Sequence, residues 1–512
     1  MRLFHSPARP ARSRRPVLSL QCLEAREVPA GNVTATVSPL GVFAILGDDD
    51  ANDITVNVTA TGATITGNAG TTVNGAGSAT VGTFKSIKAD LKGGDDVFSI
   101  DPAAGFKVTG ATSITLGDGD NTLNMITTGK IELAALTVKG GDGMDTVTVQ
   151  GGAGTNSVVN GAALFSYLNG GSTTNLTDIK FGTTAKVVAT EGAGLDTNDV
   201  LGTNLTVVKT LAASLGSSNP AQVVLTDSSI GGLTASGMVI QALLENTTVT
   251  GNIVMKGGYQ ADVQMTDGVS IKNVTLTAPL PSIETTPLTT GSTINGNLTL
   301  TGTGWTSVSL LGTTTVTEVK GNVTVTGGWF NDSFVADSNF KVGKSLTLNL
   351  KGGDNNVSIG DGVAAVTIGG NLKITGGNGN DTILLDRVTL TAAVPLLGSA
   401  TILTFGGADL LMIEDSSSFA KTFTADMGAG NDTISIAQNT GATAAVAFTG
   451  NAKILGGTGN DSLFLGVDLA DGDANTKVTF GGSKNLVDGG LGINIFDAAS
   501  GQFTGVTPIN WA

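Results

Sequence analysis

The sequence GNLKITGGNGNDTILL, residues 370–385, contains the repeating unit of this chain. It reads as a short alternating strand, a glycine-rich corner that ends at Asp381, and a second alternating strand. Similar lines begin at Gly251, Gly296, Gly321 and Gly450. In all five lines an Asn precedes the last polar residue of the corner by 10 positions. The same structural unit therefore recurs along the chain.

The spacing of the corners predicts the architecture. Most neighbouring corners end 24 or 25 residues apart, and intervals of 51 span two periods. A period near 25 is typical of stacked coils that bury their apolar faces against each other. We therefore expect an all-β fold, a parallel β-solenoid with about 25 residues per coil. Strands at 323–325, 346–348 and 372–374 should lie parallel in one sheet. These corners end at Asp96, Asn121, Asp145, Asp196, Ser307, Asp332, Asn356, Asp381, Asp432 and Asp461.

The composition excludes several classes of site. The chain has 512 residues, 74 of them Gly, and its formal net charge is −15. An acidic protein repels nucleic acid, so we expect no nucleic-acid partner. The single His and the single Cys are His5 and Cys22, both within the first 30 residues. The rest of the chain therefore contains neither a Cys/His zinc site nor a His-dependent catalytic triad.

The sequence suggests four segments. Residues 1–30 form a basic leader rich in Arg and Pro, so we expect this segment to lie outside the solenoid without stable structure. Residues 31–276 form the N-terminal part of the solenoid, and residues 291–512 form its more regular C-terminal part. Between them, residues 277–290 contain three prolines and are predicted to form a loop, because proline lacks the amide that a central strand needs. No apolar run approaches the roughly 20 residues of a transmembrane segment.

The leader carries a resemblance to a known family. Residues 23–30 read LEAREVPA, after an Arg-rich start. This resembles the LExRxxPA leader of large repeat proteins of planctomycete-type bacteria, whose bodies carry similar Gly-Gly-x-Gly-Asn-Asp lines. The resemblance implies export to the cell surface or to the extracellular space.

The corners also resemble the calcium-binding nonapeptide G-G-x-G-x-D-x-U-x of RTX proteins. Asp145, Asp381, Asp432 and Asp461 match its acidic position, and these four are our candidate Ca²⁺ ligands. Calcium takes six to eight oxygen ligands, which stacked glycine turns can supply. The alternative is a metal-free ladder of Asn and Asp turns, because RTX nonapeptides follow each other every nine residues whereas these corners recur about every 25. The sequence leaves both interpretations open.

Two classes of function fit this pattern. The first is a non-enzymatic structural or adhesive protein, whose partners are cell-surface glycans or other surface proteins; Tyr259, Trp305 and Trp329 lie at or beside corners and could stack on sugar. The alternative is a polysaccharide-active β-helix enzyme, either a lyase or a hydrolase. Residues 265–273 superficially resemble an Asn-Thr-Asp line of polygalacturonases, but the body has no His for the companion motif. A cleft with convergent carboxylates and a Lys or Arg would favour the enzyme.

Overall fold

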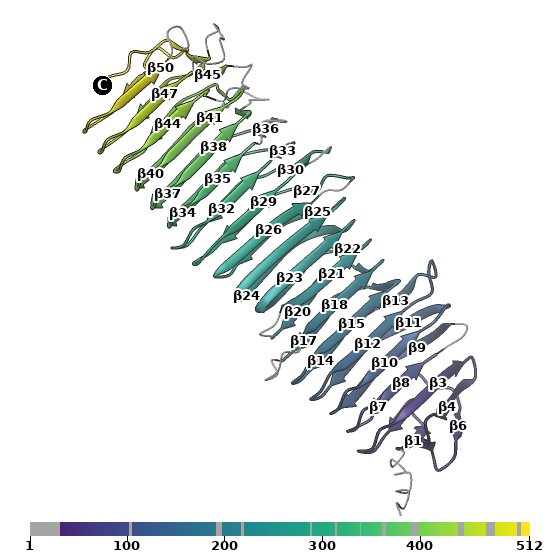
Figure 1. Cartoon of the computed structure of the whole chain (residues 1–512). Coiled ribbons are helices and arrows are strands. Elements are labelled where there is room, and N and C mark those ends of the chain that lie inside the picture. The colour runs from purple at the N-terminus through teal and green to yellow at the C-terminus, as the bar shows by residue number, and fades with distance from the viewer. Residues whose placement is uncertain are drawn as a thin grey trace, which may run out of the picture.

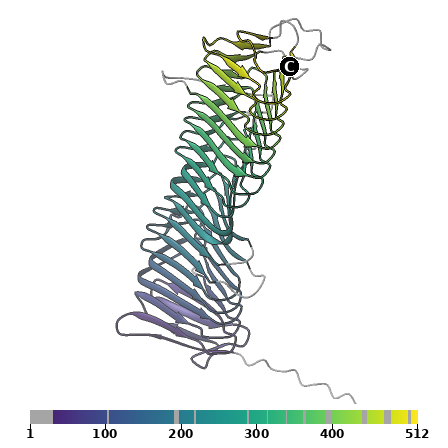
Figure 2. The same ribbon diagram turned by 90° about the vertical axis from the view of Figure 1, so that its left-hand side faces the viewer.

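The computed structural model describes residues 31–101, 105–190, 197–216, 220–286, 289–312, 315–337, 339–360, 365–390, 398–438, 445–466, 477–498 and 503–511. Within these ranges the chain is all-β, with 51 strands and no helix. The predicted leader, residues 1–30, and the predicted corner at Asp196 lie outside the described residues. The strands form a long, slightly curved rod in which successive coils stack on each other (Figures 1 and 2).

An antiparallel cap occupies the N-terminal end of the rod (Figure 1). Strand β1 pairs antiparallel with β2, β3 pairs with β4, and β4 pairs with β6. Short β5 instead lies parallel to β1. The cap joins the solenoid because β2 and β3 also pair in parallel with β7 and β8. Its strands are β1 (Asn32–Val37), β2 (Val42–Leu46), β3 (Asp53–Thr59), β4 (Gly62–Gly67), β5 (Thr72–Val73) and β6 (Ser78–Val81).

Beyond the cap, the strand pairings are parallel and join equivalent segments of neighbouring coils, which makes three sheets along the rod. Sheet A follows the glycine-rich corners. It contains β8 (Val97–Ile100), β10 (Thr122–Ile126), β12 (Asp145–Gln150), β15 (Ser172–Thr177), β18 (Asn198–Thr203), β21 (Ala221–Thr226), the ends of β23 (Leu233–Glu245) and β24 (Thr248–Thr266), β26 (Leu280–Thr286), β29 (Ser307–Leu310), β32 (Ser333–Ala336), β35 (Asn356–Ile359), β38 (Thr382–Asp386), β41 (Leu410–Glu414), β44 (Thr433–Ile436), β47 (Ser462–Leu465) and β50 (Ile495–Ala498).

Sheet B comes next in each coil. It contains the first residues of β9 (Gly105–Gly117), β11 (Lys130–Gly140), β24 and β25 (Ser270–Thr277), together with β13 (Ser157–Val159), β16 (Ile179–Phe181), β19 (Thr206–Val207), β22 (Ser229–Ile230), β27 (Thr293–Ile294), β30 (Thr317–Val319), β33 (Phe340–Val342), β36 (Val366–Ile368), β39 (Val388–Leu390), β42 (Ser418–Phe419), β45 (Val446–Phe448), β48 (Val478–Phe480) and β51 (Phe503–Thr504).

Sheet C completes each coil and leads into the next glycine-rich corner. Besides the remaining segments of β9, β11, β23, β24 and β25, it contains β7 (Ser86–Asp90), β14 (Ala163–Tyr167), β17 (Ala185–Ala189), β20 (Leu211–Leu215), β28 (Leu298–Thr301), β31 (Val323–Thr326), β34 (Leu346–Gly352), β37 (Leu372–Asn378), β40 (Ala400–Gly406), β43 (Phe423–Asp426), β46 (Ala452–Leu455) and β49 (Leu486–Asp488). Val323 pairs with Leu346, and Leu346 pairs with Leu372. The predicted parallel arrangement of these three strands is confirmed, as is the solenoid fold.

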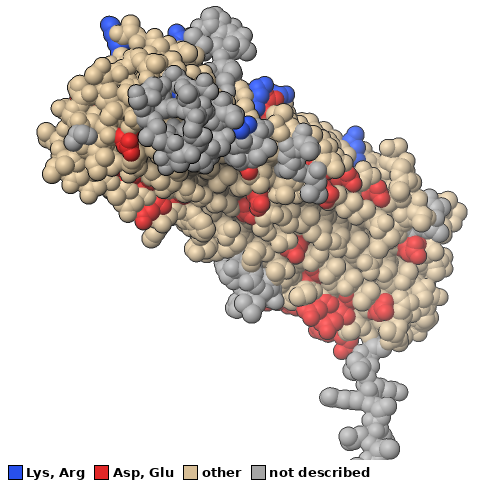
Figure 3. Space-filling view, turned by 45° about the horizontal axis from the view of Figure 1, so that its top comes forward, with Lys and Arg blue, Asp and Glu red and all other residues tan. Residues whose placement is uncertain are grey.

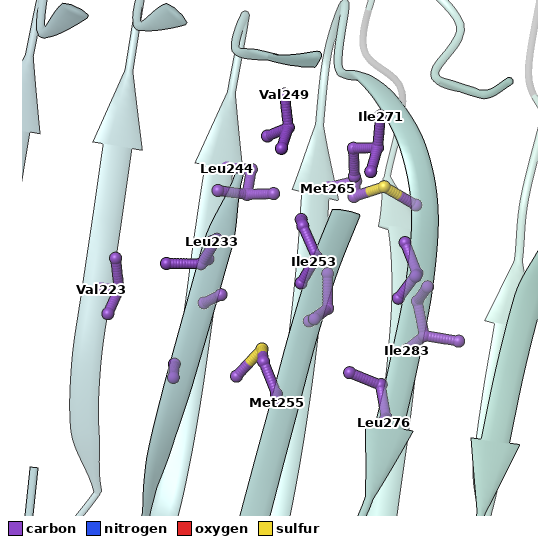
Figure 4. Close-up of a cluster of buried hydrophobic side chains, with 14 of the residues drawn as sticks. Val223, Leu233, Leu244, Val249, Ile253, Met255, Met265, Ile271, Leu276 and Ile283 are labelled. Atoms are coloured by element: carbon purple, nitrogen blue, oxygen red, sulfur yellow. The ribbon is translucent and has the colours of Figure 1, made fainter. Parts of the chain in front are cut away.

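Strand alternation builds the core. Residues on one side of each strand are buried, as in β35, β38 and β41, and their Val, Ile, Leu and Ala side chains form one continuous cluster. In the middle of the rod the inward side chains of β21 and β23–β26 face each other across the interior (Figure 4). Burying one such side chain stabilises the fold by about 1.5–3 kcal/mol.

Aromatic side chains reinforce the C-terminal part of sheet B. Phe419, Phe448 and Phe480 come from three successive coils, and each is buried. The Phe419 and Phe448 ring centroids lie 5.3 Å apart, and those of Phe448 and Phe480 lie 5.0 Å apart, with nearly parallel ring planes. The three rings therefore form a stack along the axis of the solenoid.

The proline-containing segment differs from our prediction. The loop expected over residues 277–290 is wrong for residues 280–286, which form β26 in sheet A. Pro281 is buried and pairs in register with Ala261, while Ser282 pairs with Ser307 of the next coil. A proline removes only one amide, and the strand keeps its pairing on both sides. Pro279 lies in the corner before the strand. The stack thus continues between the two predicted halves of the solenoid.

Candidate functional site at the coil corners

Each glycine-rich corner ends with a polar side chain that turns into the interior. We call this row the interior ladder. In it, a backbone amide of one coil donates to a side-chain oxygen of the next coil: the Asp409 amide to Asp432 Oδ1 at 2.9 Å, and the Asp432 amide to Asp461 Oδ1 at 2.9 Å. The same bond links seven further pairs: Asn52 to Asp96, Asp96 to Asn121, Thr306 to Asp332, Asp332 to Asn355, Asn355 to Asp381, Asp381 to Asp409, and Asp461 to Asn494.

The four predicted calcium ligands all belong to this ladder and are buried, with at most 1% of their surface exposed. Asp381, Asp432 and Asp461 lie in one C-terminal run, in which Asp409 separates the first two. Asp145 is not brought together with them, because it belongs to the N-terminal coils and contacts Asn121.

Asp409 was not predicted from the sequence. Its corner, Gly406-Gly407-Ala408-Asp409, has Ala where the best-formed corners have Asn directly before Asp, and it departs from the 25-residue period. It lies 28 residues after Asp381 and 23 before Asp432. The pair of glycines before Asp409 was the available signal. At two other corners the predicted last residue differs by one position from the residue in the ladder. Thr306 and Asn355 occupy the ladder, instead of the predicted Ser307 and Asn356.

The second carboxylate oxygen is the unusual feature of this row. Oδ2 of Asp145, Asp432 and Asp461 is buried without a hydrogen-bond partner. Its counterpart in Asn121 is Nδ2, which donates to the carbonyls of Gly117 and Gly119 at 3.0 Å each. An ionised carboxylate offers no such donor.

The pKa values of the ladder aspartates reflect this environment. Burial raises the pKa of Asp145 and Asp432 to about 7 and that of Asp381 to about 6, while amide hydrogen bonds oppose the shift. Burial also raises the pKa of Asp461. The interior therefore favours the protonated, neutral form of these side chains.

The space beside the ladder bears on calcium. A methyl group added at Gly140 would lie 1.8 Å from Asp145 Oδ2, and one added at Gly376 would lie 2.0 Å from Asp381 Oδ2. These carboxylates thus pack directly against the glycine backbone of their own corner. The described residues contain no group of three or more His, Cys, Asp or Glu side chains that could hold a metal ion. Calcium at these four residues stays a prediction.

Two further ladders run on the exposed side of the rod, with the opposite polarity. At the glycine-rich corner, the Asn380 amide donates to Asp354 Oδ1 of the preceding coil at 2.8 Å. Before sheet C, the Asn297 amide donates to Asn273 Oδ1 at 2.7 Å, and the Asn322 amide donates to Asn297 Oδ1 at 2.9 Å. The Asn that opens each repeat in the sequence therefore links neighbouring coils.

A polar hollow of 290 Å³ on sheet A is relevant to the enzyme alternative. It contains two carboxylates, Asp262 and Glu284, and none of its lining residues is Lys or Arg. Asp262 already accepts hydrogen bonds from Gln241 at 2.8 Å and from Ser282 at 2.8 Å. Acidic side chains are also spread along the face in Figure 3 and gather near the N-terminal coils.

No family model, curated protein or solved structure matches this chain. In the described part of the chain, no helix is long and apolar enough to cross a membrane.

Proposed function

We propose that this protein is a non-enzymatic, exported rod that acts as a structural or adhesive element at the cell surface or outside the cell. The observation that carries the proposal is the parallel pairing, which continues coil after coil from β7 to β51. A stack of this kind presents equivalent corner residues at regular intervals along an extended surface, which suits a spacer or a multivalent adhesive surface.

Two further observations support a non-enzymatic role. The carboxylate that a hydrolase would need in the sheet A hollow, Asp262, is held by Gln241 and Ser282. The ladder aspartates are buried, so no substrate can reach them without opening the coil. The LExRxxPA-like leader, as a resemblance, supports export.

Surface labelling of intact producing cells tests the location. An antibody against the solenoid should label intact cells or the medium, and external protease should remove the cell-bound signal. A strain that lacks the protein should attach less well or lose envelope integrity. Signal found only after lysis would overturn the proposed location.

A product assay tests the enzyme alternative separately. Purified protein should release neither reducing ends nor unsaturated products from polysaccharides. Release that is lost in Asp262→Asn and Glu284→Gln variants would replace our proposal by the enzyme.

Calcium at the corners is part of the proposal and has its own test. If Asp381, Asp432 and Asp461 bind calcium, millimolar Ca²⁺ should raise the melting temperature relative to chelator. The triple Asp→Asn variant should lose this rise. Identical melting with Ca²⁺ and with chelator would leave the ladder a purely structural role.

A further inference from the structure

One stretch of the glycine-rich corner differs from the rest because its side chains are large and apolar, and three of the four are aromatic. Tyr259, Leu280, Trp305 and Phe330 come from four successive coils, as the pairing of β24, β26, β29 and β32 shows. They line a hollow of 860 Å³ at the edge of sheet A. Trp305 and Leu280 also line the polar hollow on sheet A, so the two hollows adjoin, and we call them together the groove.

The aromatic side chains of this groove are exposed to solvent. Tyr259, Trp305 and Phe330 keep 54%, 53% and 67% of their surface accessible. Of the five strongly exposed aromatic side chains in the described residues, only Phe405 lies outside residues 259–330. Exposed apolar groups that gather in one patch, next to polar groups, are typical of a binding surface.

The charge of the groove selects the ligand. Its polar side chains include the half-buried Gln260 and the exposed Glu284, Asn331 and Asp354, and neither hollow is lined by Lys or Arg. A nucleic acid could stack on the rings, but its phosphates would meet carboxylates. A polyuronate would be repelled for the same reason. Aromatic faces beside hydrogen-bond acceptors instead suit a neutral molecule with apolar ring faces and many hydroxyl donors.

The length of the groove indicates more than one sugar unit. Tyr259 and Phe330 are three coils apart, which is about 14 Å along the axis at the usual strand spacing. A chain of pyranose rings laid along the axis would meet Trp305 and Phe330 in succession.

We propose that this groove binds a neutral polysaccharide, whose sugar rings stack on Trp305 and Phe330 and whose hydroxyl groups donate to the neighbouring carboxylates and amides. The proposal rests on the adhesive function proposed above, since it names the partner of the rod.

The test measures binding of neutral hexasaccharides, a cello-, a manno- and a laminari-oligosaccharide, to the full-length protein by calorimetry and tryptophan fluorescence. At least one should bind and change the fluorescence, whereas an oligogalacturonate should bind at least 10-fold more weakly. Trp305→Ala and Phe330→Ala should each weaken binding at least 10-fold. Both side chains are exposed, so circular dichroism of the variants should match the parent.

Phe405→Ala is the matched control, because Phe405 is equally exposed but lies outside the groove. It should bind like the parent. Equal binding by Trp305→Ala, a preference for the oligogalacturonate, or no binding to any neutral hexasaccharide would overturn the proposal. If the protein is labelled on intact cells but binds no glycan, only this inference is wrong. If it binds the glycan but is confined to the cell interior, only the proposed location is wrong.

Discussion

At the scale of single residues, the interior ladder combines burial with the ability to ionise. Asn occupies the same row at Asn121 and Asn355, where Nδ2 donates to corner carbonyls. Asp432 fills the equivalent place with an oxygen that has no partner, and the nearby Asp409 and Asp461 further raise its pKa. Where Asn and Asp occupy the row, it uses an acceptor at Oδ1 but does not require a negative charge.

The Asp432→Asn variant removes the buried charge and keeps the acceptor. The pKa of Asp432 is raised to about 7 in the folded protein, so ionisation at pH 8 opposes folding. Asn keeps the acceptor for the Asp409 amide and removes the charge. In chelator at pH 8, we expect the variant to gain on the order of 1 kcal/mol in urea unfolding, with a smaller gain at pH 5.

Asp432→Ala is the control for this variant. It leaves the buried Asp409 amide without its acceptor and should lose about 1–3 kcal/mol at both pH values. If Asp432→Asn were as unstable as Asp432→Ala at pH 8, the charge would be required and our interpretation would be wrong.

At the scale of strands, the ring stack of Phe419, Phe448 and Phe480 couples β42, β45 and β48. Phe448 is the middle ring and is fully buried. Phe448→Ala removes contacts to both neighbouring coils and leaves a cavity, so we expect a loss of about 3–5 kcal/mol. Hydrogen exchange should show faster opening mainly in the coils around β45, since each coil contacts only its neighbours. Phe405→Ala, at an exposed ring, should change neither the stability nor the exchange rates. Faster exchange spread evenly along the whole rod after Phe448→Ala would contradict nearest-neighbour coupling.

At the scale of the whole molecule, the buried aspartates make stability depend on pH. The pKa values of Asp96, Asp145 and Asp432 are raised from 3.8 to about 7, and those of Asp332 and Asp381 to about 6. Between about pH 4 and pH 7, the folded protein therefore keeps these aspartates protonated, whereas the unfolded chain has already released the protons. The stability that this protonation provides is fully present below pH 4 and is lost as the pH rises through 7. We expect a lower urea midpoint at pH 8 than at pH 5; an equal or higher midpoint at pH 8 would show that the ladder carboxylates are ionised in the fold.

The fold was predictable from the sequence because the same local chemistry recurs. The Gly-rich corner and the alternation of lines such as 370–385 specify parallel coils without any long-range information. Pro281 shows where local rules fail: its neighbours on both sides hold the strand despite the missing amide. The direction of the ladder side chains was not predictable either, since an Asp after two glycines can face solvent or core. The groove at Trp305 was not predictable as one surface, because its residues come from four coils and become neighbours only when these coils stack.

Beyond the cap, each described strand pairs only with its counterparts one coil away, so the coils resist a pull along the rod one after another. A pull applied to the two ends of the chain detaches an end coil first, because none of the described strands bridges distant coils. The rod should then lengthen by detaching one coil at a time, each releasing about 25 residues, or roughly 85 Å of extended chain. Single-molecule stretching should record a series of small, similar extensions instead of one large rupture. Such a tether absorbs work while the remaining coils stay folded, which is a useful property for an anchor exposed to flow.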